Sequence, residues 1–381
     1  MSSFSLKHLA QIIERDSKDS TYKFALLRGT IDVIQNYPHY KQADDAGRIY
    51  FPMGLMVLKW IEYYYPLLAS TAFIPQKYGD NENRSIAFRK EFQEVTRLYA
   101  FASTSDQLMY DLKRGITDPA RLEVILSLVR KLKNTIVKQP MHYIGSSVGM
   151  GGEIYSYTAR HSTTPGVLTQ EWIIQSMGSF SIPVDFHHVL QVVGAFVSGT
   201  NSIIFKWAEF TSALTSDEHI TTGEMISLLN REVSERDVRQ AKDFYSNILM
   251  QEKLECVWSG KSLENSMHID HAFPFVALRN NDLWNLLPSH ELVNIKKRDG
   301  IPAPELLKQA RIRDRIVYSW EKLASSFHDQ FFSEFRVSLL GSARINESNW
   351  KSQCYDGLIH MSSYLIEERG LIPWKYNLSE P

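Results

Sequence analysis

The chain has 381 residues, of which 44% are hydrophobic and 12% aromatic, so it can bury sizeable cores and is not a long disordered segment. This length predicts two or three domains. The formal net charge of −1 excludes a general electrostatic attraction to nucleic acid. Any affinity for DNA must therefore come from a local patch or from a partner.

The number of cysteines and the length of the apolar windows predict the compartment of the protein and whether it crosses a membrane. Cys256 and Cys354 are too few for a dense disulfide framework or a Cys-only zinc site, so we expect a cytoplasmic protein. The N-terminus has no basic segment leading into an apolar run, so secretion is not expected. The most apolar window, 49–74, is interrupted by charges and by Pro66, which predicts a buried helix and no membrane association.

The first part of the chain has hydrophobic residues at helical intervals. These intervals predict helices over about 21–36, from Pro52 to 65, over 85–101 and over 119–137, in a helical N-terminal domain spanning 1–140.

The composition then changes: glycines become frequent, and apolar and polar residues alternate over short stretches. This pattern predicts a mixed segment over 141–215 with short strands. The candidate strands are the alternating Glu153-Ile154-Tyr155-Ser156-Tyr157-Thr158, Trp172-Ile173-Ile174 and Phe180-Ser181-Ile182-Pro183. Gly149-Met150-Gly151-Gly152 lacks the lysine and hydroxyl of a phosphate loop, so it predicts a turn and no nucleotide cofactor. The neighbouring His187 and His188 are expected to diverge into core and surface positions.

The last part is predicted to hold connecting helices over 216–250, a compact α+β segment over 251–307 and a helical C-terminal region over 308–381. One helix is expected from Pro304 through Leu323, and another from Ser348 to Glu368. Tyr63-Tyr64-Tyr65, Trp207 and Trp320 are expected to pack in cores. The fold class is therefore mainly α with a small α+β insert.

Chemistry concentrates in the segment 251–307. Mg²⁺ prefers oxygen ligands and often takes one or two protein groups, and Asp270 and the amide oxygen of Asn294 are ligands of that kind. His271 follows Asp270 and would lie on the other face of a strand, where it could act as a base. Asn285 lies in the connecting turn, where its amide could bond the backbone and orient the histidine. This set predicts metal-assisted hydrolysis of a phosphodiester.

The order, spacing and residue types of this region resemble the HNH endonuclease family, whose fold is the ββα-metal finger, and in particular the HNH domain of CRISPR RNA-guided nucleases. The matching runs are Cys256-Val257-Trp258-Ser259-Gly260-Lys261, Ile269-Asp270-His271-Ala272-Phe273-Pro274-Phe275, Asn280-Asn281-Asp282-Leu283-Trp284-Asn285-Leu286-Leu287 and Val293-Asn294-Ile295-Lys296-Lys297 with Pro302. The resemblance covers about 253–307.

The resemblance implies a role for each matched residue. His271 is the general base, Asp270 and Asn294 hold Mg²⁺, for which Mn²⁺ can substitute, and Asn285 positions the histidine. Lys297 matches the lysine after the last ligand, which contacts phosphate or orients the site. His268 departs from the pattern, because the RNA-guided nucleases often carry an acidic residue there. Many HNH proteins bind a structural zinc through paired Cys-x-x-Cys knuckles. Here Cys256 is paired with Ser259, so no structural zinc is expected.

Basic residues follow the matched segment. Between 296 and 322 they exceed the acidic ones by four, and on a single helix some would form one stripe. A solvated face and contact with a phosphate backbone are equally good interpretations of this stripe. The candidate DNA-binding residues are Lys296, Arg298, Lys308, Arg311 and Arg315.

Together these features predict a metal-dependent HNH endonuclease that hydrolyses or nicks DNA. The chain is similar to nuclease subunits of bacterial restriction or antiphage systems, such as the HNH subunit of a Zorya-type operon, in which partner proteins supply recognition. One alternative is a helical DNA-binding or interaction subunit whose finger does not cut. Another is an RNA-cleaving toxin that uses the same chemistry.

Overall fold

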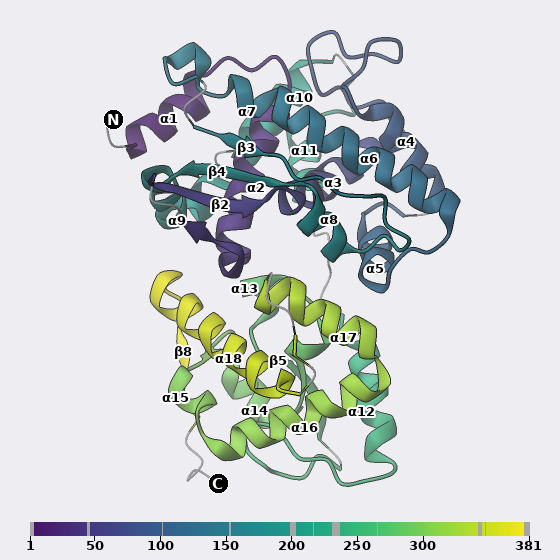
Figure 1. Cartoon of the computed structure of the whole chain (residues 1–381), viewed down its shortest axis with the longest axis vertical. Helices are drawn as coiled ribbons and strands as arrows, with labels where there is room; N and C mark the ends of the chain where they lie inside the picture. The colour runs from purple at the N-terminus through teal and green to yellow at the C-terminus, as the bar shows by residue number, and fades with distance from the viewer. Residues whose placement is uncertain are drawn as a thin grey trace. The chain divides into compact units, whose positions relative to one another are not determined.

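The computed structural model of the chain is mainly helical, with small antiparallel sheets (Figure 1). It describes residues 4–43, 46–100, 102–151, 154–198, 203–215, 217–230, 237–264, 266–341, 345–346 and 348–376. The chain divides into two compact units, Met1–Val233 and Ser234–Pro381. We describe each by itself as unit 1 and unit 2.

Unit 1 contains most of the helices predicted from hydrophobic spacing. The helix expected over 21–36 is Tyr22–Asn36, and the one expected over 119–137 is Pro119–Lys138, where Asp118 accepts a hydrogen bond from the backbone N–H of Arg121. The helices of unit 1 are α1 (Leu6–Arg15), α2 (Tyr22–Asn36), α3 (Met53–Leu68), α4 (Arg89–Leu98), α5 (Asp106–Arg114), α6 (Pro119–Lys138), α7 (Pro140–Tyr143), α8 (Gln170–Ser176), α9 (Val184–Ser198), α10 (Ile203–Ala213) and α11 (Thr222–Leu229), with 3₁₀ turns η1 (Pro38–Tyr40) and η2 (Ser146–Val148).

A four-stranded antiparallel sheet completes unit 1. Its strands are β1 (Gln42–Ala43), β2 (Arg48–Pro52), β3 (Ser156–Thr158) and β4 (Ser179–Pro183), in the order β1-β2-β4-β3. The alternating segment predicted as a strand contains β3 in its described part, 154–158, and the strand predicted at 180–183 is confirmed as β4. It pairs on one side with β2, where Tyr50 faces Ser181, and on the other with β3, where Tyr157 faces Phe180.

The prediction of a strand at Trp172-Ile173-Ile174 is wrong, because these residues lie in helix α8. The hydroxyl of Thr169 accepts a hydrogen bond from the Trp172 backbone N–H and so caps the helix, which outweighs the strand preference of the two isoleucines. A β-carbon at Gly54 of α3 would lie 2.1 Å from the carbonyl oxygen of Ile173. Glycine therefore lets α3 approach α8 closely, and the isoleucines are buried there.

The apolar window at 49–74 forms β2 and the buried helix α3. Among the described residues, no helix is long and apolar enough to cross a membrane. The predicted core aromatics are buried: Tyr63, Tyr64 and Tyr65 lie on α3, and the Trp207 indole N–H donates to the side-chain oxygen of Gln76. Gly149 has a φ of 80° and forms part of a turn, as predicted.

Unit 2 is built around two short strands and the helices that follow them. Its elements are α12 (Arg239–Leu249), β5 (Met267–His271), α13 (Phe275–Leu278), η3 (Leu283–Asn285), β6 (Leu286–His290), α14 (Glu291–Lys297), β7 (Ile301–Pro302), α15 (Pro304–Leu307), α16 (Ala310–Ser326), α17 (His328–Phe335), the π-helical turns η4 (Arg336–Leu340) and η5 (Tyr364–Glu368), α18 (Trp350–Ser363) and β8 (Pro373–Trp374). Strands β5 and β6 pair antiparallel, and β7 and β8 pair parallel.

The prediction of a single helix from Pro304 through Leu323 is wrong, because the chain forms two helices there, α15 and α16. Gln309 between them has an extended backbone, with φ −70° and ψ 125°, so the helical path stops and restarts. The helix predicted over 348–368 is confirmed as α18 with η5, and Gly370 follows at a φ of 68°.

The units are coarser than the segments expected from the sequence. The expected boundary at 140–141 falls inside unit 1, and those at 250–251 and 307–308 fall inside unit 2. Residues of 251–307 and of 308–381 share one core in unit 2, in which Trp258, Trp284, Trp320 and Phe335 are fully buried. The segment 251–307 therefore packs as one body with the C-terminal helices.

Candidate functional site

The predicted site residues lie on a strand pair and the helix that follows it, in unit 2 (Figure 1). Asp270 faces Leu287 and His271 faces Leu286 across the β5–β6 pair. Helix α14 begins directly after β6, where Nδ1 of His290 accepts a hydrogen bond from the backbone N–H of Leu292. The local order is strand, strand, helix.

Asp270 and Lys297 form a buried ion pair that joins α14 to β5. The Lys297 ammonium lies 3.0 Å from Oδ1 of Asp270 and donates to the backbone carbonyl of His271 at 2.6 Å. Oδ2 of Asp270 accepts a hydrogen bond of 2.7 Å from the Trp258 indole. The Asp270 side chain is 4% exposed, so its charge is compensated almost entirely by the protein.

Asn294 is partly exposed and lies three residues before Lys297 on α14. Residues three apart on a helix share a face. Val293 and Lys297 are the buried residues of α14, and Asn294 follows Val293 at the edge of this buried face. The contact between Lys297 and Asp270 joins the helix that carries Asn294 to the strand that carries Asp270.

His271 is buried beside the loop that connects the strands. Its Nε2 lies 3.1 Å from Oδ1 of Asn281, and its ring packs edge to face on Phe275. An amide oxygen only accepts, so the ring nitrogen donates in the tautomer that carries its proton on Nε2. In this tautomer Nδ1 carries the lone pair that a general base needs.

Asn285 closes the loop between the strands and is fully buried. Its Oδ1 accepts from the backbone N–H of Phe273 at 2.7 Å, and its Nδ2 donates to the Phe273 carbonyl at 3.0 Å and to Oδ1 of Asn280 at 3.1 Å. One side chain thus satisfies both backbone groups of a residue two positions after His271. These bonds fix the path of the chain that leaves β5.

The donor set suits a hard cation that keeps waters and substrate oxygens as ligands. Among the described residues there is no group of three His, Cys, Asp or Glu side chains that could hold a metal. A carboxylate and an amide oxygen are sufficient for Mg²⁺, which commonly takes one or two protein ligands. The Lys297 ammonium already places a cation against Asp270. The residues present therefore fit Mg²⁺.

The candidate DNA-binding residues do not share one stripe, because the helix break at Gln309 separates Lys308 from α16. Lys296, Arg298, Lys308 and Arg311 are exposed. Arg315 instead donates to the Val257 carbonyl at 3.1 Å and lies 3.5 Å from Glu255, so it holds the preceding segment of unit 2.

Four further residues named in the sequence analysis lie in the core or on the surface. Cys256 is fully buried. His268 has a side chain that is 46% exposed and lies 3.8 Å from Glu291. His187 is buried and His188 is exposed, so the prediction that they diverge is confirmed.

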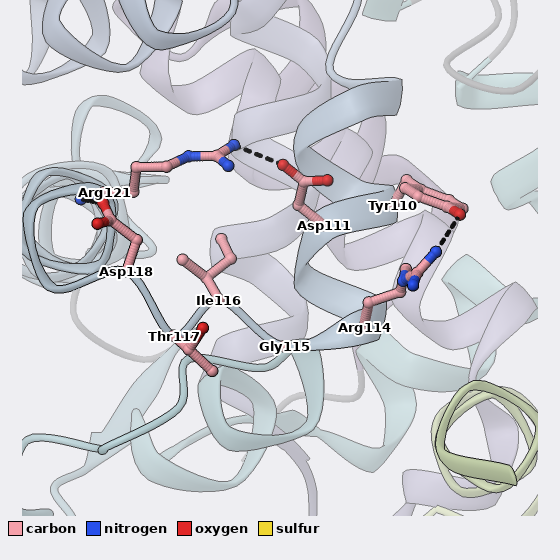
Figure 2. Close-up of a pocket in the computed structure, with 8 residues that line it drawn as sticks. All are labelled: Tyr110, Asp111, Arg114, Gly115, Ile116, Thr117, Asp118 and Arg121. Carbon is pink, nitrogen blue, oxygen red and sulfur yellow. Dashed lines mark hydrogen bonds and ion pairs between the residues drawn. The ribbon is translucent and has the colours of Figure 1, made fainter.

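A cavity of about 300 Å³ lies in unit 1 between α5 and the start of α6 (Figure 2). Arg121 and Asp111 of its lining form an ion pair, and Arg114 donates to the hydroxyl of Tyr110 at 2.8 Å. The side chain of Asp118 accepts from the backbone N–H of Arg121.

Three residues around the site were missed by the sequence reasoning. Trp258 bonds Asp270, Asn281 bonds His271, and Glu334 of α17 accepts the backbone N–H of Leu283 at 2.6 Å. A buried indole needs an acceptor, but the sequence does not show which group accepts from Trp258. All three contacts depend on the tertiary fold.

Comparisons with known proteins match unit 1 and leave the strand–helix site outside the match. No curated protein and no solved structure matches the chain. One family matches, over residues 2–229, and its description is a domain of unknown function, DUF8808. The chain belongs to this DUF8808 family.

Proposed function

We propose that the chain is a Mg²⁺-dependent HNH endonuclease that hydrolyses or nicks DNA, with the segment 267–297 as its ββα-metal finger. The observation that carries the proposal is the buried contact between Lys297 on α14 and Asp270 on β5. It joins the helix that carries Asn294 to the strand that carries Asp270 and His271.

In the proposed reaction, Asp270 and Asn294 hold the metal through a carboxylate and an amide oxygen. When bound, Mg²⁺ stabilises negative charge on the phosphate and on the leaving oxygen. His271 takes a proton from the attacking water through Nδ1, while Asn281 holds Nε2. Asn285 keeps the chain after His271 in place through its two bonds to Phe273.

Substrate access requires movement in this proposal. Asp270 and His271 are 3% and 2% exposed, and the ring of Phe275 packs on the imidazole. Phe275 lies in the one-turn helix α13, whose neighbour Val276 is 69% exposed. Displacing this turn would open His271 to water and phosphate.

Recognition of the target is assigned to partner proteins, as in a restriction or antiphage system. The net charge of −1 provides little general attraction to DNA, so the exposed Lys296, Arg298, Lys308 and Arg311 would supply local phosphate contacts. Such contacts position a duplex but carry no sequence information.

The test is cleavage of supercoiled plasmid and of RNA by the purified chain, alone and with the products of its neighbouring genes, in Mg²⁺, Mn²⁺ or EDTA. We expect nicked or linear DNA only with metal. His271→Ala should reduce the rate at least about a hundredfold, the usual scale of general-base catalysis. His268→Ala, which changes a half-exposed histidine on the same strand, should leave the rate unchanged.

Other outcomes would contradict the proposal. Intact plasmid under all conditions would refute it, and cleavage of RNA alone would favour an RNA-cleaving toxin. DNA binding and biological activity that survive in both Asp270→Ala and His271→Ala would favour a non-cutting interaction subunit.

A further inference from the structure

Trp258 binds the carboxylate that the proposed function assigns to the metal. Its indole N–H donates to Oδ2 of Asp270 at 2.7 Å, and the Trp258 side chain is fully buried. We infer that Trp258 is a positioning residue, which holds Asp270 in the orientation that presents Oδ1 to the cation. This inference rests on the proposed function, since it assumes that Asp270 binds the metal.

Trp258 lies in a turn that backbone hydrogen bonds close. The backbone N–H of Cys256 donates to the Lys261 carbonyl and that of Gly260 to the Cys256 carbonyl, at 2.9 and 2.8 Å. Gly260 has a φ of 73°, and a β-carbon there would lie 2.7 Å from the guanidinium of Arg315. Glycine therefore allows both the turn and the close approach of Arg315, which binds the carbonyl of the neighbouring Val257.

The C-terminal segment holds the same indole from another direction. The ring of Trp374 packs edge to face on Trp258, with centroids 5.4 Å apart at 84°. Trp374 is fixed by the β7–β8 pair, in which the Ile301 N–H donates to the Ile372 carbonyl and the Ala303 N–H to the Trp374 carbonyl, both at 2.9 Å. Residues near the end of the chain thus support the site.

The two carboxylate oxygens of Asp270 have different partners. Oδ1 faces the Lys297 ammonium, a charged group that an incoming cation can displace, whereas Oδ2 faces a neutral N–H that does not compete for positive charge. The indole therefore can stay in place when metal binds and prevents rotation of the carboxylate. Partners of this kind typically contribute 10–100-fold, by order of magnitude, to metal affinity.

The experiment is a titration of the full-length chain with Mn²⁺, in which free Mn²⁺ is measured by electron paramagnetic resonance. Trp258→Phe removes the N–H but keeps an aromatic ring. The matched control is Trp320→Phe in the same core, because the Trp320 indole is also fully buried and donates to a carbonyl, that of Trp284, at 2.9 Å. We expect Trp258→Phe to weaken Mn²⁺ binding roughly 10–100-fold and Trp320→Phe to leave it unchanged.

Each outcome decides between the inference and the proposed function. Wild-type affinity in a folded Trp258→Phe variant would overturn the inference alone, as would equal losses in both variants. A wild-type chain that binds no Mn²⁺ would overturn both. If Trp258→Phe lowers the melting temperature more than the control, benzothienylalanine at 258 keeps the bicyclic shape without the N–H. It should show the same loss of Mn²⁺ affinity, and wild-type affinity there would overturn the inference.

Discussion

Lys297 and Asp270 are joined across α14 and β5 by an ion pair of 3.0 Å, with side chains that are 0% and 4% exposed. Removing water from two charges is costly, and the cost is recovered only while both partners are present. This pair therefore links the stability of unit 2 to the chemistry of the proposed site.

The first prediction concerns the stability of this pair. Asp270→Asn and Lys297→Met should each destabilise unit 2 by about 3–5 kcal/mol, because each leaves one buried charge without compensation. The double variant should lose less than the sum of the two. Hydrogen–deuterium exchange of β5 and α14 peptides would measure this, and additive losses would show that the two side chains do not interact.

A second prediction separates the ion pair from metal binding. Lys297→Met removes the ammonium that lies against Asp270, so Mn²⁺ should bind tighter, by about tenfold or 1.4 kcal/mol. DNA cleavage should still fall, since the resemblance gives this lysine a role in contacting phosphate or orienting the site. Isothermal titration calorimetry and plasmid nicking measure the two effects. Weaker Mn²⁺ binding in the variant would mean that Lys297 supports the metal rather than occupying its place.

Asn285 provides a third prediction. Asn285→Ala leaves the backbone N–H and carbonyl of Phe273 buried without their side-chain partner, at a cost of about 1–3 kcal/mol for each group. Asn280→Ala removes two bonds between side chains, to Asn285 and to Asp282, and should cost about 1 kcal/mol for each bond. Urea unfolding followed by circular dichroism compares them. Equal costs would contradict the positioning role of Asn285.

The fourth prediction concerns acid sensitivity of unit 1. Burial, with smaller contributions from Lys41 and His188, lowers the pKa of His187 from 6.5 to about 4. Between these values the unfolded chain binds a proton that the folded chain excludes, so stability rises with pH and falls as the pH drops from 6.5 towards 4. The full loss is about 3 kcal/mol at 1.4 kcal/mol per pKa unit.

The measurement is thermal unfolding of His187→Gln and His188→Gln between pH 7 and pH 4.5. His187→Gln should reduce the pH dependence, whereas His188→Gln should keep it, because His188 is exposed. The same pH dependence in His187→Gln as in the wild type would refute the assignment to His187.

Helices with long, regular apolar spacing were predictable, and α2 and α6 lie within one residue of their expected bounds. Trp172-Ile173-Ile174 was misread because aromatic and β-branched residues favour strands, while the Thr169 cap and packing against Gly54 decide for a helix. The break at Gln309 has no glycine or proline to signal it, so the sequence offers no local reason to expect two helices.

For the candidate site, the sequence predicted which elements carry Asp270, His271 and Asn285, because these residues lie near turns in a recognisable order. It could not predict that Trp258 bonds Asp270, since that contact is made by folding a separate turn onto β5. The role of Arg315 was missed for the same reason. The sequence placed Arg315 on an exposed stripe of one helix, whereas in the structure its guanidinium donates to the Val257 carbonyl.

The most direct test of the central claim is anomalous scattering from a crystal grown with Mn²⁺. The account predicts one peak within about 2.2 Å of a carboxylate oxygen of Asp270 and of the amide oxygen of Asn294, with the Lys297 ammonium displaced. No peak between these residues, with Lys297 still bound to Asp270, would contradict it.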